Sequence, residues 1–201
     1  MKYLFSFLLL CVTLHFVTAQ EFDKQIANAK SAYDAGNFED SRLAVQNALH
    51  EIDIKIGQEV LAALPQKIDN MQYISSGDQV SGSGGDFTGM FVERTWGSTT
   101  STNLEFSVMS DSPMIGTVNT FLSLPLIMTS SDSNQKKIKV EGFKAMLEKK
   151  VDESGTVTGF SLMLPYSNSL LQLNYTGATT EEAFMAMVKQ IPVTRITEIA
   201  K

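Results

Sequence analysis

Cysteine and histidine are nearly missing from this sequence, and their scarcity excludes several kinds of site. The chain has one Cys and two His, which are Cys11, His15 and His50. A zinc site needs several Cys or His ligands, and a disulfide needs two Cys. A catalytic Cys–His pair needs a Cys in the mature chain, whereas Cys11 lies in the N-terminal stretch that we expect to be removed. We therefore name no catalytic residue, no cofactor-binding residue and no metal ligand from the sequence.

Motifs for nucleophilic catalysis and phosphate binding are also missing. No Gly-x-Ser-x-Gly segment occurs, and the Gly-rich stretch 77–89 lacks the Lys-Ser/Thr ending of a P-loop. We interpret this stretch as a flexible connector between strands.

The alternative to a non-enzymatic protein is a hydrolase-type enzyme with a dispersed carboxylate and hydroxyl site. Glu93, Arg94 and Asp111 could supply it, although no spacing selects them.

The N-terminus has the layout of a cleavable secretory signal. Lys2 supplies a positive start, residues 4–17 are mostly apolar, and small residues at Val17 and Ala19 precede a cleavage point. We expect residues 1–19 to be removed and the mature chain to be exported, to the periplasm or the extracellular space. The apolar run is too short for a good anchor, so we expect no stable membrane span after cleavage.

Acidic residues outnumber basic ones. The chain has 22 Asp+Glu against 16 Lys+Arg, and Lys2 is the only charged residue of the predicted signal, so the mature chain has a net charge of −7. Negative charge repels phosphate backbones, so we expect no nucleic-acid partner. The oligomeric state cannot be read from these features.

Residues 20–65 predict a helical hairpin that precedes the main domain. Apolar residues recur at three- and four-residue steps on both sides of a break at Gly36-Asn37, and Pro65 ends the second helix. We expect the apolar stripe of the second helix to pack within the hairpin and against the following domain. The alternative is that it docks a partner. The stripe consists of Val45, Leu49, Ile52, Ile56 and Val60.

The hairpin resembles a single tetratricopeptide repeat over residues 26–52. Residues 36–38 stand at the turn of the repeat, and Ser41 and Ala48 stand at positions where the repeat has small residues. The opening signature of the repeat and its closing Pro are missing. Repeats of this kind need neighbours to bury their faces, so the resemblance implies a structural brace rather than a peptide-binding groove.

Residues 66–201 predict an α+β sandwich domain with the order β-β-α-β-β-β-α, with an extra short strand near Met71 or Ile138. Leu104, Phe106 and Val108 alternate with polar residues, which is typical of a half-buried strand. Tight turns join most strands and so predict an antiparallel sheet. Pro165 is expected to end its strand, and Asn174 to face solvent while its two neighbours face the core.

Two further resemblances concern this domain. Its element order resembles the PsbP-like α+β fold, which implies a fold and no function. The segments 59–65, 92–95 and 111–114, which include a Leu-Pro helix end, an Arg-bearing strand and an Asp-Ser-Pro-Met helix start, resemble an uncharacterised family of secreted or periplasmic bacterial proteins. That second resemblance implies export and assigns no functional residue.

The helix predicted from Met114, which ends at about Ser123 or continues to about Met128, is apolar on nearly every side. No charged residue lies between Asp111 and Asp132. Such a helix is either fully buried or meets a partner. We therefore predict a non-enzymatic exported protein that binds a protein partner or an apolar ligand. The candidate partner surface consists of Met114, Ile115, Val118, Phe121 and Leu122.

Overall fold

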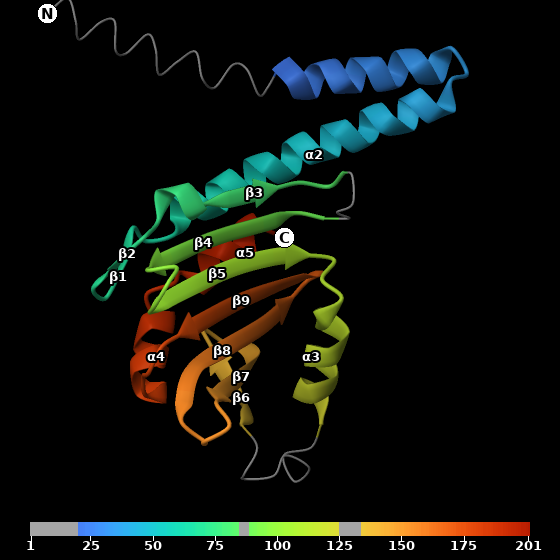
Figure 1. The fold of residues 1–201 in the computed structure, drawn as a ribbon. Helices are drawn as coiled ribbons and strands as arrows, with labels where there is room; N and C mark the ends of the chain where they lie inside the picture. The colour runs from blue at the N-terminus through green and yellow to red at the C-terminus, as the bar shows by residue number, and fades with distance from the viewer. Residues whose placement is uncertain (1–19, 85–88, 125–133) are drawn as a thin grey trace, which may run out of the picture.

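The computed structural model describes residues 20–84, 89–124 and 134–201. The predicted signal over residues 1–19 lies outside the described residues. The described part is an α+β protein in which a pair of N-terminal helices precedes a large antiparallel sheet (Figure 1). Both features confirm the fold class that the sequence predicts.

The helical pair consists of a helix over residues 20–34 and α2 (Phe38–Ala63). The turn between them places Gly36 at φ +77°, a conformation that costs glycine little because it has no Cβ. The side chain of Asn37 caps α2 by accepting a hydrogen bond from the Asp40 backbone N–H. Leu64 caps the other end in an extended conformation, as expected for a residue that precedes proline.

The main sheet has seven strands within the described residues, in the order β3-β4-β5-β9-β8-β7-β6, and every neighbouring pair is antiparallel. β1 (Lys67–Ile68) and β2 (Met71–Gln72) form a separate ribbon. The strands of the main sheet are β3 (Gln79–Ser81), β4 (Phe91–Gly97), β5 (Asn103–Ser110), β6 (Gln135–Val140), β7 (Phe143–Val151), β8 (Val157–Tyr166) and β9 (Ser169–Thr176).

Helices cover the two faces of the sheet unequally. The C-terminal part of α2, α4 (Glu181–Val188) and α5 (Val193–Ile199) share one buried cluster with Leu104, Phe106 and Val108, which confirms the predicted alternation in β5. A 3-10 turn at Ser75–Gly77 leads into β3. α3 (Met114–Ser123) lies on the opposite face, where Val118 packs against side chains of β7 and β9.

The interpretation of the stretch 77–89 as a flexible connector is wrong in part. The stretch 77–89 is not only a connector, because Gln79–Ser81 pairs with β4 as an edge strand. The backbone N–H and the hydroxyl of Ser83 also donate to Asp53 Oδ2 at 2.7 and 2.6 Å, so this part of the stretch is attached to α2.

Pro165 does not end its strand, because β8 continues to Tyr166. Its pairing with β7 stops at Met163, while its pairing with β9 runs to the hairpin turn. The pair that flanks a two-residue turn is hydrogen-bonded, so the next pair, which contains Pro165, is not. The missing N–H of Pro165 therefore costs the ladder nothing.

Two positional expectations fare differently. Leu173 and Tyr175 are buried in the core, as predicted, while Asn174 lies on the other face and is half-buried rather than fully exposed. Its amide oxygen accepts hydrogen bonds from Ser161 and Gln172. Short strands occur both near Met71 and at Ile138.

Candidate functional site: the uncovered face of the helical hairpin

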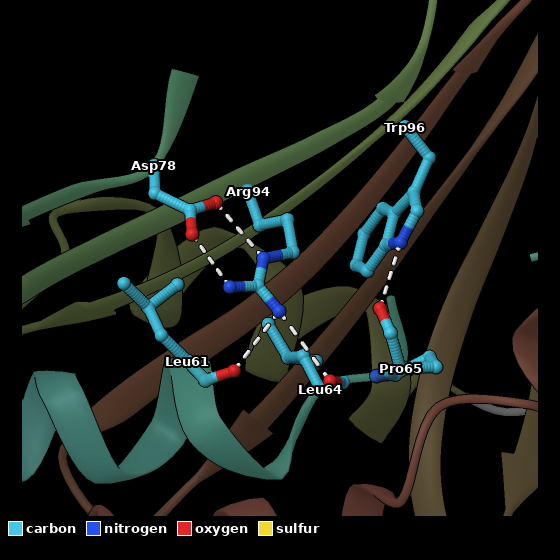
Figure 2. A network of polar contacts seen from close by, with 6 residues as sticks. All are labelled: Leu61, Leu64, Pro65, Asp78, Arg94 and Trp96. Atoms are coloured by element: carbon cyan, nitrogen blue, oxygen red, sulfur yellow. Dashed lines mark hydrogen bonds and ion pairs between the residues drawn. The ribbon is translucent and has the colours of Figure 1, made fainter. Parts of the chain in front are cut away.

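Arg94, a candidate for a dispersed enzyme site, is a structural anchor instead. Its side chain is 8% exposed and points to the helix-covered face, where it forms a two-pronged ion pair with Asp78, with Nε–Oδ1 and Nη2–Oδ2 distances of 2.8 and 2.5 Å (Figure 2). Nη1 donates to the carbonyl oxygens of Leu61 and Leu64 at the end of α2. The arginine thus joins the sheet to the C-terminal end of the hairpin.

Glu93 and Asp111 lie elsewhere. Glu93 alternates with Arg94 along β4 and so faces the other side of the sheet, where partial burial and then the nearby charge of Glu105 raise its pKa. Asp111 lies at the end of β5 with φ +53°, and its carboxylate accepts a hydrogen bond from the side chain of Asn168. The structure does not bring Glu93, Arg94 and Asp111 together.

The predicted partner surface on α3 is divided between burial and exposure. Val118 is fully buried against Met146 and Leu170, while Met114 is 43% exposed. Ile115, Phe121 and Leu122 are half-buried and pack against the same cluster. The described helix ends at Ser123, which confirms the shorter of the two predicted ends. Its continuation to Met128 falls in residues 125–133, which lie outside the described part.

The helical hairpin is held together by small residues. Ala29 from the first helix and Ser41, Ala44 and Ala48 from α2 are buried where the two helices meet. The hydroxyl of Ser41 donates to the carbonyl oxygen of Ala29 at 2.9 Å. Because these side chains are short, the two helices come close together, and the larger apolar side chains are left on the outside of the pair.

Those larger side chains form an uncovered apolar face on one side of the hairpin. On α2, positions 38, 45, 49 and 52 lie on one helical stripe at steps of seven, four and three residues, and Arg42 occupies the intermediate position of the first step. The ring of Tyr33 contacts the ring of Phe38 with centroids 5.5 Å apart, so the stripe of the first helix lies on the same side. We call this set the hairpin face: Ile26, Tyr33, Phe38, Val45, Leu49 and Ile52, which are 41–64% exposed.

The other side of the hairpin is mostly polar. A shallow groove there is lined by Gln25, Asn28, Ser31, Ala32, Ala35, Asn37, Asp40, Leu43, Ala44 and Asn47. Leu43 is the only large apolar residue in this lining, although it is 55% exposed. The hairpin is therefore amphipathic as a unit, and its two sides differ in the chemistry that they present.

The hairpin face continues the core of the protein. Going along α2, Val60 is fully buried in the main cluster, Ile56 is half-buried against it, and Ile52 is 41% exposed. Figure 1 shows why: α2 extends past the edge of the sheet, and the first helix lies on the side of α2 away from the sheet. The expectation that the stripe packs against the domain holds for Val60 and Ile56 and is wrong for Val45, Leu49 and Ile52.

Charged residues of both signs lie on and beside the hairpin face. By their helical positions, Lys30 lies between Ile26 and Tyr33, and Arg42 lies between Phe38 and Val45. Asp34 and Glu39 stand next to the stripe on its outer side. In the part of the chain that the structure describes, none of these four side chains forms an ion pair. They are available to a partner that covers the face.

Other kinds of site have less support. Among residues 20–84, 89–124 and 134–201, no group of three or more His, Cys, Asp or Glu side chains is placed to hold a metal ion. Within the same ranges, no helix combines the length and the apolar character needed to cross a bilayer.

Comparisons with known proteins add no assignment: no protein-family model, no curated protein and no solved structure matches the chain.

Proposed function

We propose that this chain is an exported, non-enzymatic protein that acts by binding another protein through the hairpin face. The observation that carries the proposal is the concentration of exposed apolar side chains on the hairpin. Of the ten large hydrophobic residues that are exposed in the described chain, seven lie between Ile26 and Ile52. Contiguous exposed apolar surface of this kind is typical of protein interaction sites.

The shape of the surface favours a protein over a small apolar ligand. Ligand pockets are concave and enclose most of the ligand, whereas the hairpin face is the outer surface of two adjacent helices. A flat amphipathic helical surface fits an apolar helix face or another helical pair. The outer side of α3, with Met114 exposed, offers less apolar surface and is a weaker candidate.

Export is part of the same proposal. The apolar N-terminal run with small residues before position 20 supports it, as does a mature chain without cysteine, which folds independently of the redox state of its compartment. A binding protein in the cell envelope or the extracellular space needs no catalytic group, and the dispersed positions of Glu93, Arg94 and Asp111 agree with this.

Site-specific photo-crosslinking tests the proposal. A photoreactive phenylalanine analogue replaces Leu49 on the hairpin face or, as the matched control, Leu43 on the polar side of the same helix. The two leucines are 49% and 55% exposed, so they differ in location far more than in accessibility. In cells that produce the protein, position 49 should give a discrete protein adduct and position 43 should not. Equal labelling at both positions, or no adduct from position 49, would reject the proposal.

A further inference from the structure

One hairpin supplies two of the four helices of a four-helix bundle. Two antiparallel helices with one apolar face leave that face open, and a second pair placed over it completes a four-helix bundle with a buried centre. A second copy of this chain presents the same face, so it can meet the first through a two-fold axis. The polar groove on the opposite side of each hairpin stays in solvent.

The size of the hairpin face is suited to such a contact. From Phe38 to Ile52 the stripe on α2 runs for about 21 Å at the rise of an α-helix. The six large side chains of the hairpin face and their neighbours together expose a surface area on the order of 700 Å² per copy. This area is close to the roughly 800 Å² that each partner buries in a stable interface.

The charges at the border also favour a second copy. A face bordered only by acidic residues would repel its own copy, and the chain as a whole is acidic. Lys30 and Arg42 stand beside Asp34 and Glu39 instead, and none of them has an ion-pair partner within the described chain. A two-fold contact therefore does not set a purely acidic surface against itself.

We propose that the hairpin face binds the hairpin face of a second copy, so that the mature protein is a homodimer held by a four-helix bundle. This inference rests on the proposed function and names its partner. Position 45 is the midpoint of the stripe between Phe38 and Ile52, so an antiparallel arrangement places Val45 of the two copies near the axis. Phe38 of each copy then lies opposite Ile52 of the other.

The first test measures the mass of the purified mature chain, starting at residue 20, by sedimentation velocity and by light scattering over a concentration series. We expect the mass of a dimer. Leu49→Glu places a carboxylate in the centre of the contact and should reduce the mass to that of a monomer. Leu43→Glu adds the same charge to the polar side and should leave the dimer unchanged. Far-UV circular dichroism verifies that both variants retain their helices.

A cysteine crosslink provides the second test. Cys11 lies in the predicted signal, so the mature chain contains no other thiol. Mild oxidation of Val45→Cys should give a disulfide-linked dimer that retains its circular dichroism spectrum, whereas Leu43→Cys should stay largely monomeric.

The outcomes separate this inference from the proposed function. A monomer at every concentration, or equal loss of the dimer in Leu43→Glu and Leu49→Glu, overturns the dimer. If the purified chain is monomeric while the photoreactive group at position 49 labels a different protein in cells, the dimer is wrong and the proposed function stands. An adduct with twice the mass of the chain supports both.

Discussion

Removing Asp78 should destabilise the protein far more than the loss of a surface charge would. Asp78→Ala leaves the Arg94 guanidinium on the covered face of the sheet with two carbonyl acceptors and the ring of Tyr73, whose centroid lies 4.6 Å from Cζ. Breaking a buried ion pair by removing one partner costs about 3–5 kcal/mol. The side chain of Asp78 is 20% exposed, so water reaches part of the site and we expect a value near 3 kcal/mol.

The chain carries its own probe for this measurement. Trp96 is the only tryptophan, it is fully buried, and its indole N–H donates to the carbonyl oxygen of Pro65 at 2.9 Å (Figure 2). Urea unfolding followed by its fluorescence therefore reports on the end of α2 that Arg94 holds. Far-UV circular dichroism should give the same transition if unfolding is two-state.

A double-mutant cycle identifies the source of the loss. Arg94→Met removes the buried charge but leaves the carbonyl oxygens of Leu61 and Leu64 without their donor, at about 1–3 kcal/mol for each group that stays buried. The double variant Asp78→Ala with Arg94→Met should be less destabilised than the sum of the single variants by at least about 1.5 kcal/mol. If Asp78→Ala costs less than about 1 kcal/mol, the pair behaves as an exposed one and the anchoring argument is refuted.

Three further predictions concern packing, pH and the extent of the hairpin. Gly116→Ala should stabilise the protein by about 0.5–1 kcal/mol in thermal unfolding, because a Cβ at this position meets open space. Gly57→Ala should destabilise it, since a Cβ there would lie 2.4 Å from Val80 Cγ1. Stabilisation of both variants would contradict this packing. Burial, opposed by the Ser169 hydroxyl, raises the pKa of Tyr166 from 10.0 to about 12, so the contribution of the neutral hydroxyl to stability is complete below pH 10 and is lost as the pH rises through 12. Relative to Tyr166→Phe, the unfolding free energy should fall by roughly 1.4 kcal/mol per pH unit between these values. Parallel curves for the two proteins would show that the hydroxyl titrates normally. The monomeric Leu49→Glu variant is the reference for two truncations. A chain that begins at residue 53 should keep most of the unfolding free energy of that reference, whereas one that begins at residue 66 should lose most of it with the buried Val60 and Leu64. Equal losses in urea unfolding would show that residues 20–52, the outer hairpin, support the core.

Periodicity and proline positions carry much of the fold prediction. In β5 the predicted core residues are the buried ones, because a half-buried strand repeats every two residues whatever it packs against. The end of α2 before Pro65 and the start of α3 at Met114 follow from local backbone chemistry in the same way. These features depend on near neighbours in the chain, which the sequence displays directly.

Features that depend on distant partners were missed. β3 has only three residues, too few for a pattern, and it is a strand because β4 pairs with it. Arg94 was a candidate for chemistry because the sequence cannot show that Asp78 and the end of α2 surround it. Pro165 was expected to end β8 because the sequence does not show which of its two edges lacks a partner.

The exposure of the hairpin follows from a difference in length. At 26 residues α2 is about 39 Å long, whereas the strands beside it, β3 and β4, have three and seven residues and span at most about 23 Å. A helix that crosses this edge of the sheet must therefore extend beyond it. If its apolar stripe served only the sheet, it would end near Ile56, where packing against the core stops. The stripe continues through Ile52 and Leu49 to Phe38, and the first helix adds Ile26 and Tyr33 on the same side. This continuation beyond the core is the reason to treat the outer hairpin as a binding element rather than as a brace.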